Sequence, residues 1–222
     1  MAMAPGSTLA DYLVPSSRSS RSLNLLKDAL LIIGFNVLMI LSARASIYLW
    51  FTPVPITLQT LALMLTAGTL GSRRGALAML LYLAEGASGL PVFVGGAGWL
   101  YLVASPTAGY LWSYPIAAFV VGFLCERGLD RSFLTSIFAM LPGTVIIYAF
   151  GVSWLAFGIH LGLSKALAVG MLPFIPGDLI KMVVAALLLP AAWSIVRALR
   201  LGRNPGEPID GAFRQMGNDQ EM

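Results

Sequence analysis

The chain has 222 residues, of which 58% are hydrophobic and only 11% are charged, and its mean hydropathy is +0.82. Soluble domains carry about 25% charged residues, so this composition excludes an ordinary soluble protein and indicates a membrane protein. The net charge is +4. It comes mostly from basic residues beside apolar segments, where such residues normally set membrane orientation, so we expect no nucleic-acid partner.

Six apolar segments follow one another along the chain. They lie near residues 27–46, 57–72, 74–89, 109–126, 132–158 and 177–199. Backbone groups that face lipid must be paired within the segment, which allows helices or a closed barrel, and these segments lack the alternation of barrel strands. A transmembrane helix needs about 20 residues. We therefore expect an all-α integral membrane protein with six transmembrane helices.

The helices leave room only for short loops and two tails. We expect residues 1–26 to form a mobile cytoplasmic tail, residues 27–200 the six-helix membrane domain, and residues 201–222 a disordered cytoplasmic tail. The first tail is rich in serine and lacks the apolar core of a secretory signal. The last tail combines glycine, proline and charges of both signs, a composition typical of disorder.

Basic residues divide the connections into two sets. Four connections carry most of them: Arg18, Arg21 and Lys27; Arg73 and Arg74; Arg127 and Arg131; and Arg197, Arg200 and Arg203. The connections between these carry only Arg44 and Lys165. Because positive residues in short loops stay on the cytoplasmic side, we expect both termini in the cytoplasm.

An ionisable pair stands at the start of the last apolar segment. Asp178 and Lys181 lie three positions apart, just after Pro176 and Gly177, and this spacing puts both side chains on one face of a helix. A charge at membrane depth costs roughly 2.5 to 3.5 kcal/mol, so two together indicate a cavity or a bound polar ligand. The pair is either a simple intrahelical ion pair or a fork that accepts N–H groups and donates to an oxygen of a ligand.

Polar groups also gather on the side opposite the basic connections. Two prolines in the segment 51–60 block a helix, and Thr57, Gln59 and Thr60 follow them. Thr57 either caps the next helix or contacts a ligand. Gln59 either pairs with a neighbouring helix or contacts the same ligand.

The connection at about residues 90–108 is long and still apolar, which is typical of a folded lid rather than a slack loop. It contains Gly95, Gly96 and Gly98, which permit tight turns and let main-chain N–H groups approach a ligand. Glu85 stands just before it. We expect Glu85 to have a structural role, paired with a polar neighbour or facing the aqueous loop.

Other kinds of chemistry find little support. Cys125 and His160 are the single cysteine and histidine, so we expect no metal site. Ser153 lacks the glycine context of a nucleophile elbow, and the sequence contains no P-loop. The acid and the base of the last segment also suit a membrane-embedded enzyme, but no nucleophile–base pair accompanies them. We expect a protein that is not an enzyme and needs no cofactor.

Five short motifs occur in order along the chain. They are Pro-Val-Pro-Ile-Thr-Leu-Gln at 53–59, Leu-Gly-Ser-Arg-Arg-Gly at 70–75, Gly-Leu-Pro-Val-Phe at 89–93, Pro-Thr-Ala-Gly-Tyr at 106–110 and Pro-Phe-Ile-Pro-Gly-Asp-Leu-Ile-Lys at 173–181. Together they resemble the BioY family, the substrate-binding membrane subunits, or S-components, of energy-coupling-factor (ECF) biotin transporters. The resemblance covers about residues 28–199.

This resemblance implies high-affinity capture and uptake of biotin across the bacterial cytoplasmic membrane, together with a transmembrane coupling subunit and cytoplasmic ATPase subunits. Of the substrate contacts that we expect, Gln59, Asp178 and Lys181 match positions of the family's motifs. The others are Thr57, Phe93, Gly95, Gly96, Ala97 and Tyr110. Phe93, Trp99 or Tyr110 would cover the rings of biotin. Ala97 stands where the family often has a polar side chain, so a backbone group would act there instead. The alternative is a transporter for a different vitamin.

Overall fold

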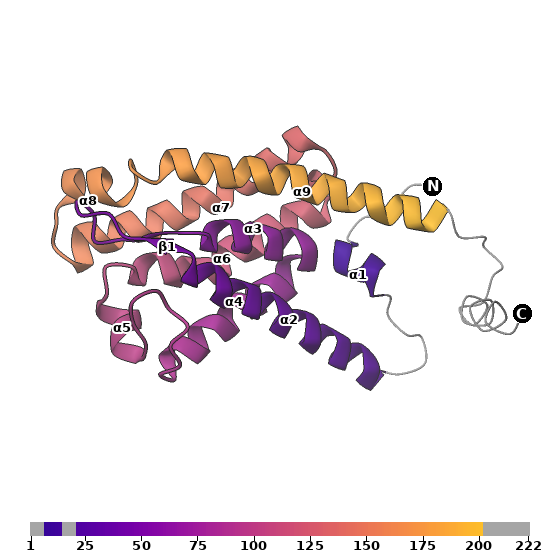
Figure 1. Cartoon of the computed structure of the whole chain (residues 1–222), viewed down its shortest axis with the longest axis horizontal. Coiled ribbons are helices and arrows are strands. Elements are labelled where there is room, and N and C mark those ends of the chain that lie inside the picture. Colours follow the sequence, from indigo (N-terminus) through magenta and orange to yellow (C-terminus); the bar gives the residue numbers. More distant parts are fainter. Residues whose placement is uncertain (1–6, 15–20, 202–222) are drawn as a thin grey trace, which may run out of the picture.

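The computed structural model describes residues 7–14 and 21–201, and its elements are almost all helical. The helices are α1 (Leu9–Leu13), α2 (Arg21–Arg44), α3 (Gln59–Leu70), α4 (Ser72–Ala87), α5 (Trp99–Ala104), α6 (Ala108–Glu126), α7 (Phe133–Ser153), α8 (Leu163–Gly170) and α9 (Ile175–Leu201). A 3-10 turn, η1 (Leu129–Arg131), precedes α7, and a π-helical turn, η2 (Trp154–Gly158), extends it. Two short antiparallel strands, β1 (Ser46–Ile47) and β2 (Ile56–Thr57), pair with each other. Figure 1 shows the long helices running along the length of an elongated bundle.

Four of these helices are long and apolar enough to cross a membrane: α2, α6, α7 with η2, and α9 as far as Ala198. The second and third predicted segments form shorter helices, α3 with 12 residues and α4 with 16. At about 1.5 Å per residue, these two measure about 18 and 24 Å. All six predicted segments are therefore helical, and the protein is a helical membrane protein, while six complete crossings stay a prediction.

Both ends of the predicted membrane domain differ in detail from the structure. The first long helix begins at Arg21 rather than at residue 27, and α1 forms within the segment that we expected to be a mobile tail. The last helix begins at Ile175, before Pro176, because proline is tolerated in the first turn, where its missing N–H has no intrahelical partner. Of the predicted C-terminal tail, residues 202–222 lie outside the described part of the chain.

Small residues bring the central helices together. A Cβ on Gly122 of α6 would lie 2.4 Å from the backbone of Gly71, and one on Gly143 of α7 would lie 2.4 Å from the side chain of Val121. Such close approach is typical of helix packing in membranes, where contact surface rather than water exclusion holds helices together. Helix α6 consequently packs against α3, α4 and α7 and forms the centre of the bundle.

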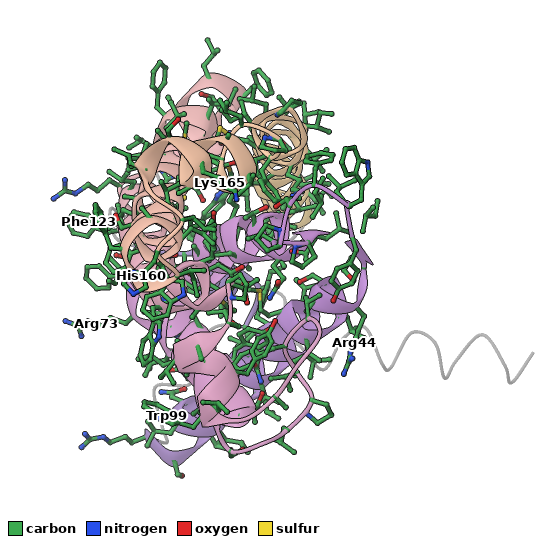
Figure 2. All side chains as sticks on the ribbon, turned by 90° about the vertical axis from the view of Figure 1, so that its left-hand side faces the viewer. Arg44, Arg73, Trp99, Phe123, His160 and Lys165 are labelled. Carbon is green, nitrogen blue, oxygen red and sulfur yellow. The ribbon has the colours of Figure 1, made fainter. Side chains whose placement is uncertain are left out.

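Among the described residues, several arginines lie in segments that meet at one end of the bundle: Arg73, Arg74, Arg127, Arg131 and Arg197. Arg74 forms ion pairs with Asp11 of α1 at 2.7 Å and with Asp28 of α2 at 3.0 Å, and Trp193 of α9 donates to Asp130 of η1. Figure 1 shows α1, the start of α2 and the last turns of α9 at this same end. We call it the basic end. Figure 2 looks onto the opposite end, where the labelled side chains include those of Arg44, His160 and Lys165.

Candidate ligand-binding site

A cavity of about 60 Å³ lies between α3, α6, α7, α9 and the loop that precedes α5. Its polar lining residues are Thr57, Gln59, Thr60, Thr107, Asp178 and Lys181. Its aromatic lining residues are Phe93, Tyr101, Tyr110, Tyr114, Tyr148 and Phe174. The cavity therefore combines an ionisable pair with aromatic walls, the combination of a few placed polar groups and apolar surface that is typical of small-molecule sites.

Asp178 is the most fully bonded polar group of the cavity. It lies in the first turn of α9, and only 6% of the residue is exposed. Its Oδ1 accepts hydrogen bonds from Lys181 Nζ at 2.8 Å and from Thr60 Oγ1 at 3.0 Å, and its Oδ2 accepts one from the Tyr148 hydroxyl at 2.5 Å. Three helices thus hold one carboxylate, α3 through Thr60, α7 through Tyr148 and α9 itself.

Lys181 supplies the donor side of the pair. The residue is 8% exposed, and its ammonium bonds to Asp178 across one turn of α9. An ammonium has three N–H donors, and within residues 7–14 and 21–201 this is the only hydrogen bond found for Lys181. The predicted intrahelical ion pair is therefore present, and it faces a cavity with donors to spare. The ion pair is confirmed, and contact of the pair with a ligand stays a prediction.

Thr57 and Gln59 bond to each other at the start of α3. The Thr57 hydroxyl accepts from the backbone N–H of Gln59 at 3.2 Å and donates to its side-chain oxygen at the same distance. Gln59 is 4% exposed, and its amide donates to the hydroxyl of Tyr82 on α4 at 2.8 Å. The N-cap of α3 is Leu58, without a side-chain hydrogen bond, so Thr57 is not the expected cap. The expected pairing of Gln59 with a neighbouring helix is present, and both residues line the cavity.

The loop between α4 and α5 is folded over the cavity, as expected of a lid. Phe93 pairs with Gly96 in an isolated bridge, and its ring packs edge-on to Tyr82 and stacks on Tyr101, at centroid distances of 5.3 and 5.7 Å. The Tyr82 hydroxyl donates to the carbonyl of Val92 at 3.0 Å. A hydrogen-bond path from Gln59 through Tyr82 therefore joins α3 and α4 to the loop.

Four predicted residues of this loop do not reach the cavity. Gly95 and Ala97 are exposed, and Gly96 lies against the ring of Tyr101. Trp99 was expected as a possible cover for the rings of a ligand, but it is 60% exposed and packs edge-on to Trp112; Figure 2 shows it at the edge of this end. Phe93 and its neighbour Val94 are the parts of the loop before α5 that line the cavity.

Several lining residues were not predicted as contacts. Tyr148 stands alone in an apolar run of α7, and Tyr101 and Tyr114 lie in or beside long apolar segments. Nothing in their local sequence distinguishes them from ordinary core aromatics, because a helix shows which residues share a face and not what that face meets. Thr60 had a weak signal as one of three polar residues at the start of α3.

Glu85 lies outside the cavity lining. It accepts a hydrogen bond at 2.7 Å from the amide of Asn36, a residue of α2 that is 2% exposed. The expected pairing with a polar neighbour is confirmed, and it joins α2 to α4. Among the residues that the structure describes, no cluster of histidine, cysteine and acidic side chains suits a metal ion.

Comparisons with known proteins agree on one family. The model of the BioY family matches residues 15–198. A "Biotin transporter BioY" of Rhizobium etli is 47% identical over 159 residues, covering 68% of this chain and 84% of that protein, and one of Thermotoga maritima is 43% identical over 154 residues, covering 69% and 88%.

A solved structure gives the same result for the fold. A crystal structure of the S-component for biotin from an ECF-type ABC transporter superposes with a TM-score of 0.68 at 29% sequence identity, covering 84% of this chain and 97% of that one. Fold, ordered motifs and sequence identity thus point the same way, and they agree with a multi-pass membrane protein. The chain belongs to the BioY family.

Proposed function

We propose that this protein captures biotin as the substrate-binding S-component of an ECF-type transporter. The relatives described above carry the name of biotin transporter, and the similar solved structure is that of an S-component for biotin. These names describe transporters rather than enzymes. The site itself supplies the physical argument for the ligand.

The observation that carries the proposal is the Asp178–Lys181 pair, buried yet incompletely bonded, at the wall of an aromatic cavity. Biotin has a ureido ring with two N–H donors and one carbonyl, an apolar sulfur-containing ring and a carboxylate tail. Asp178 accepts an N–H of such a ligand, and Lys181 donates to its oxygen. Phe93 and Tyr110 then cover the apolar rings. Thr57 and Gln59 complete the polar wall, while Gly95, Gly96 and Ala97 belong to the site only if the loop turns them inward.

The size of the cavity requires movement on binding. Ligand pockets usually measure about 300 to 1,000 Å³, and this cavity measures about 60 Å³. Phe93 closes it from the loop, held by Tyr82 and Tyr101. Biotin therefore enters when the loop and its aromatic side chains shift outward, and their return excludes water from the bound ligand.

The distribution of basic residues supports a membrane orientation with the basic end in the cytoplasm, and this orientation suits the proposed partner subunits. With the basic end in the cytoplasm, all six apolar helices cross the membrane, both termini are cytoplasmic, and the cavity lies near the outer side. An importer binds its substrate from that side. A coupling subunit in the membrane and cytoplasmic ATPases then complete the transporter, since this chain has no nucleotide-binding P-loop of its own.

Calorimetry on the full chain in detergent tests the proposal. Biotin should bind the wild-type protein, and Asp178→Asn should weaken binding by about 1.5 to 3 kcal/mol, the value of a hydrogen bond to a charged group. Asp28→Asn is a matched control, because Asp28 pairs with Arg74 at the basic end. Equal affinity in the wild type and in both variants would remove the pair from the site. Displacement of biotin by thiamine, riboflavin or pantothenate would instead identify a transporter for another vitamin.

A further inference from the structure

The carboxylate of Asp178 has little bonding capacity left. An ionised carboxylate offers about four lone-pair sites on its two oxygens. Lys181 and Thr60 occupy the two sites of Oδ1, and Tyr148 occupies one of the two sites of Oδ2. One site on Oδ2 remains for a ligand. The side chains around Asp178 therefore determine both how many ligand N–H groups it accepts and from which direction.

We infer that Tyr148 and Thr60 are positioning residues that set the substrate specificity of Asp178. Their hydroxyls approach different oxygens of the carboxylate from α7 and α3, at 2.5 and 3.0 Å, so together they fix its plane. Without them the carboxylate rotates about its Cβ–Cγ bond and is held only by Lys181 on the same helix. This inference rests on the proposed function and adds two residues that the sequence did not single out for this role.

The arrangement selects one kind of ligand edge. The free site on Oδ2 takes a single N–H, and the remaining N–H donors of Lys181 take an acceptor close by. A ligand that presents one N–H next to one carbonyl, as a cyclic ureide or lactam does, satisfies both at once. A ligand with two adjacent acceptors leaves Oδ2 facing a lone pair, and the repulsion lowers its affinity.

The alternative is that Tyr148 contacts the ligand directly and independently of Asp178. Tyr148 lines the same cavity, so a loss of affinity in Tyr148→Phe alone does not separate the two roles. A double-mutant cycle with Asp178→Asn does separate them, because residues that act through one another show non-additive effects.

The experiment measures biotin affinity of the full chain in detergent, from the biotin-dependent rise in Tm at up to millimolar biotin, so that weak variants stay measurable. Tyr148→Phe should weaken binding about tenfold in the wild-type background and less than about twofold in the Asp178→Asn background. Thr60→Val should behave in the same way with a smaller loss, about threefold, because Lys181 still holds the same oxygen. Thr60→Val also tests the inference if Tyr148→Phe does not fold.

Tyr110→Phe is the matched control. It removes the same chemical group from the same cavity, but the Tyr110 hydroxyl donates to the carbonyl of Gly170 at 2.6 Å and not to Asp178. Its cost should be the same in both backgrounds. Equal costs of Tyr148→Phe in both backgrounds, or no cost in the wild type, would overturn the inference while leaving biotin binding itself intact. Absence of biotin binding by the wild type would overturn the proposed function instead.

Discussion

Two acid–base clusters stand at opposite ends of this protein and differ mainly in burial. At the cavity, Lys181 and Asp178 meet at 2.8 Å with their side chains about one-tenth exposed. At the basic end, Arg74 meets Asp11 at 2.7 Å and Asp28 at 3.0 Å, with side chains 26 to 40% exposed. The distances are nearly equal, so geometry alone does not tell a binding site from a structural contact.

Burial changes how much each cluster contributes to the free energy of unfolding. An exposed ion pair contributes about 0 to 1 kcal/mol, because water and salt screen it. A buried pair is different: removal of one partner leaves an uncompensated charge and costs about 3 to 5 kcal/mol. A protein keeps such a pair only where bonding to neighbours or to a ligand offsets the cost. The cavity pair has bonding to neighbours, since Thr60 and Tyr148 hold Asp178, and we propose that a bound ligand adds to it.

The largest effect is expected from Lys181→Met, which keeps the length of the side chain and removes its charge. Asp178 is then buried without its cation, so the free energy of unfolding should fall by about 3 to 5 kcal/mol, measured as a lower Tm in detergent. The double variant Asp178→Asn with Lys181→Met should regain much of that stability and should still bind biotin poorly. A single variant as stable as the wild type would show that the two clusters do not differ as described.

Substitutions of two glycines should have effects of intermediate size, and the two can be compared directly. A Cβ on Gly122 would lie 2.4 Å from the backbone of Gly71, which cannot move alone, whereas one on Gly86 would lie 2.0 Å from the ring of Phe93. Overpacking typically costs about 1 to 3 kcal/mol. Gly122→Ala should therefore lower the Tm with little change in biotin affinity, and Gly86→Ala should displace Phe93 and weaken biotin binding about tenfold. The reverse pattern would contradict the assignment of the loop as a lid.

The smallest effect is expected at the basic end. Burial pushes the pKa of Asp11 up, but hydrogen bonds from Thr8 and Arg74 outweigh it and leave that pKa lowered. The contribution of Asp11 is therefore complete above its unfolded pKa of about 3.9 and is lost as the pH falls through the lower folded value.

Asp11→Asn should cost less than about 1 kcal/mol at pH 7, and its Tm difference from the wild type should shrink near pH 3. Concentrated salt should reduce that difference, whereas it should barely change the effect of Lys181→Met. A salt-insensitive loss above 2 kcal/mol would place Asp11 with the buried cluster instead.

The sequence indicated the Asp178–Lys181 pair but not Tyr148, which bonds to it, and the reason is physical. Asp178 and Lys181 are exceptional because charge is costly in an apolar segment, so they are visible without a structure. Tyr148 is not exceptional, because a tyrosine in an apolar helix is usually a core residue. Only the structure shows that its hydroxyl bonds to Asp178, 30 residues away. The loop glycines marked a turn correctly, and Gly95 and Gly96 lie outside the lining of the cavity.

The sequence by itself determined that the chain is helical and lies in a membrane, which segments are apolar, and where the acid and the base stand, because these follow from composition and from spacing along one helix. Only the tertiary structure decided which helices share the carboxylate, that Phe93 rather than Trp99 closes the cavity, and that α1 packs on the basic end. Those outcomes depend on contacts between residues far apart in the chain, and hydrophobic periodicity does not encode which apolar face meets which.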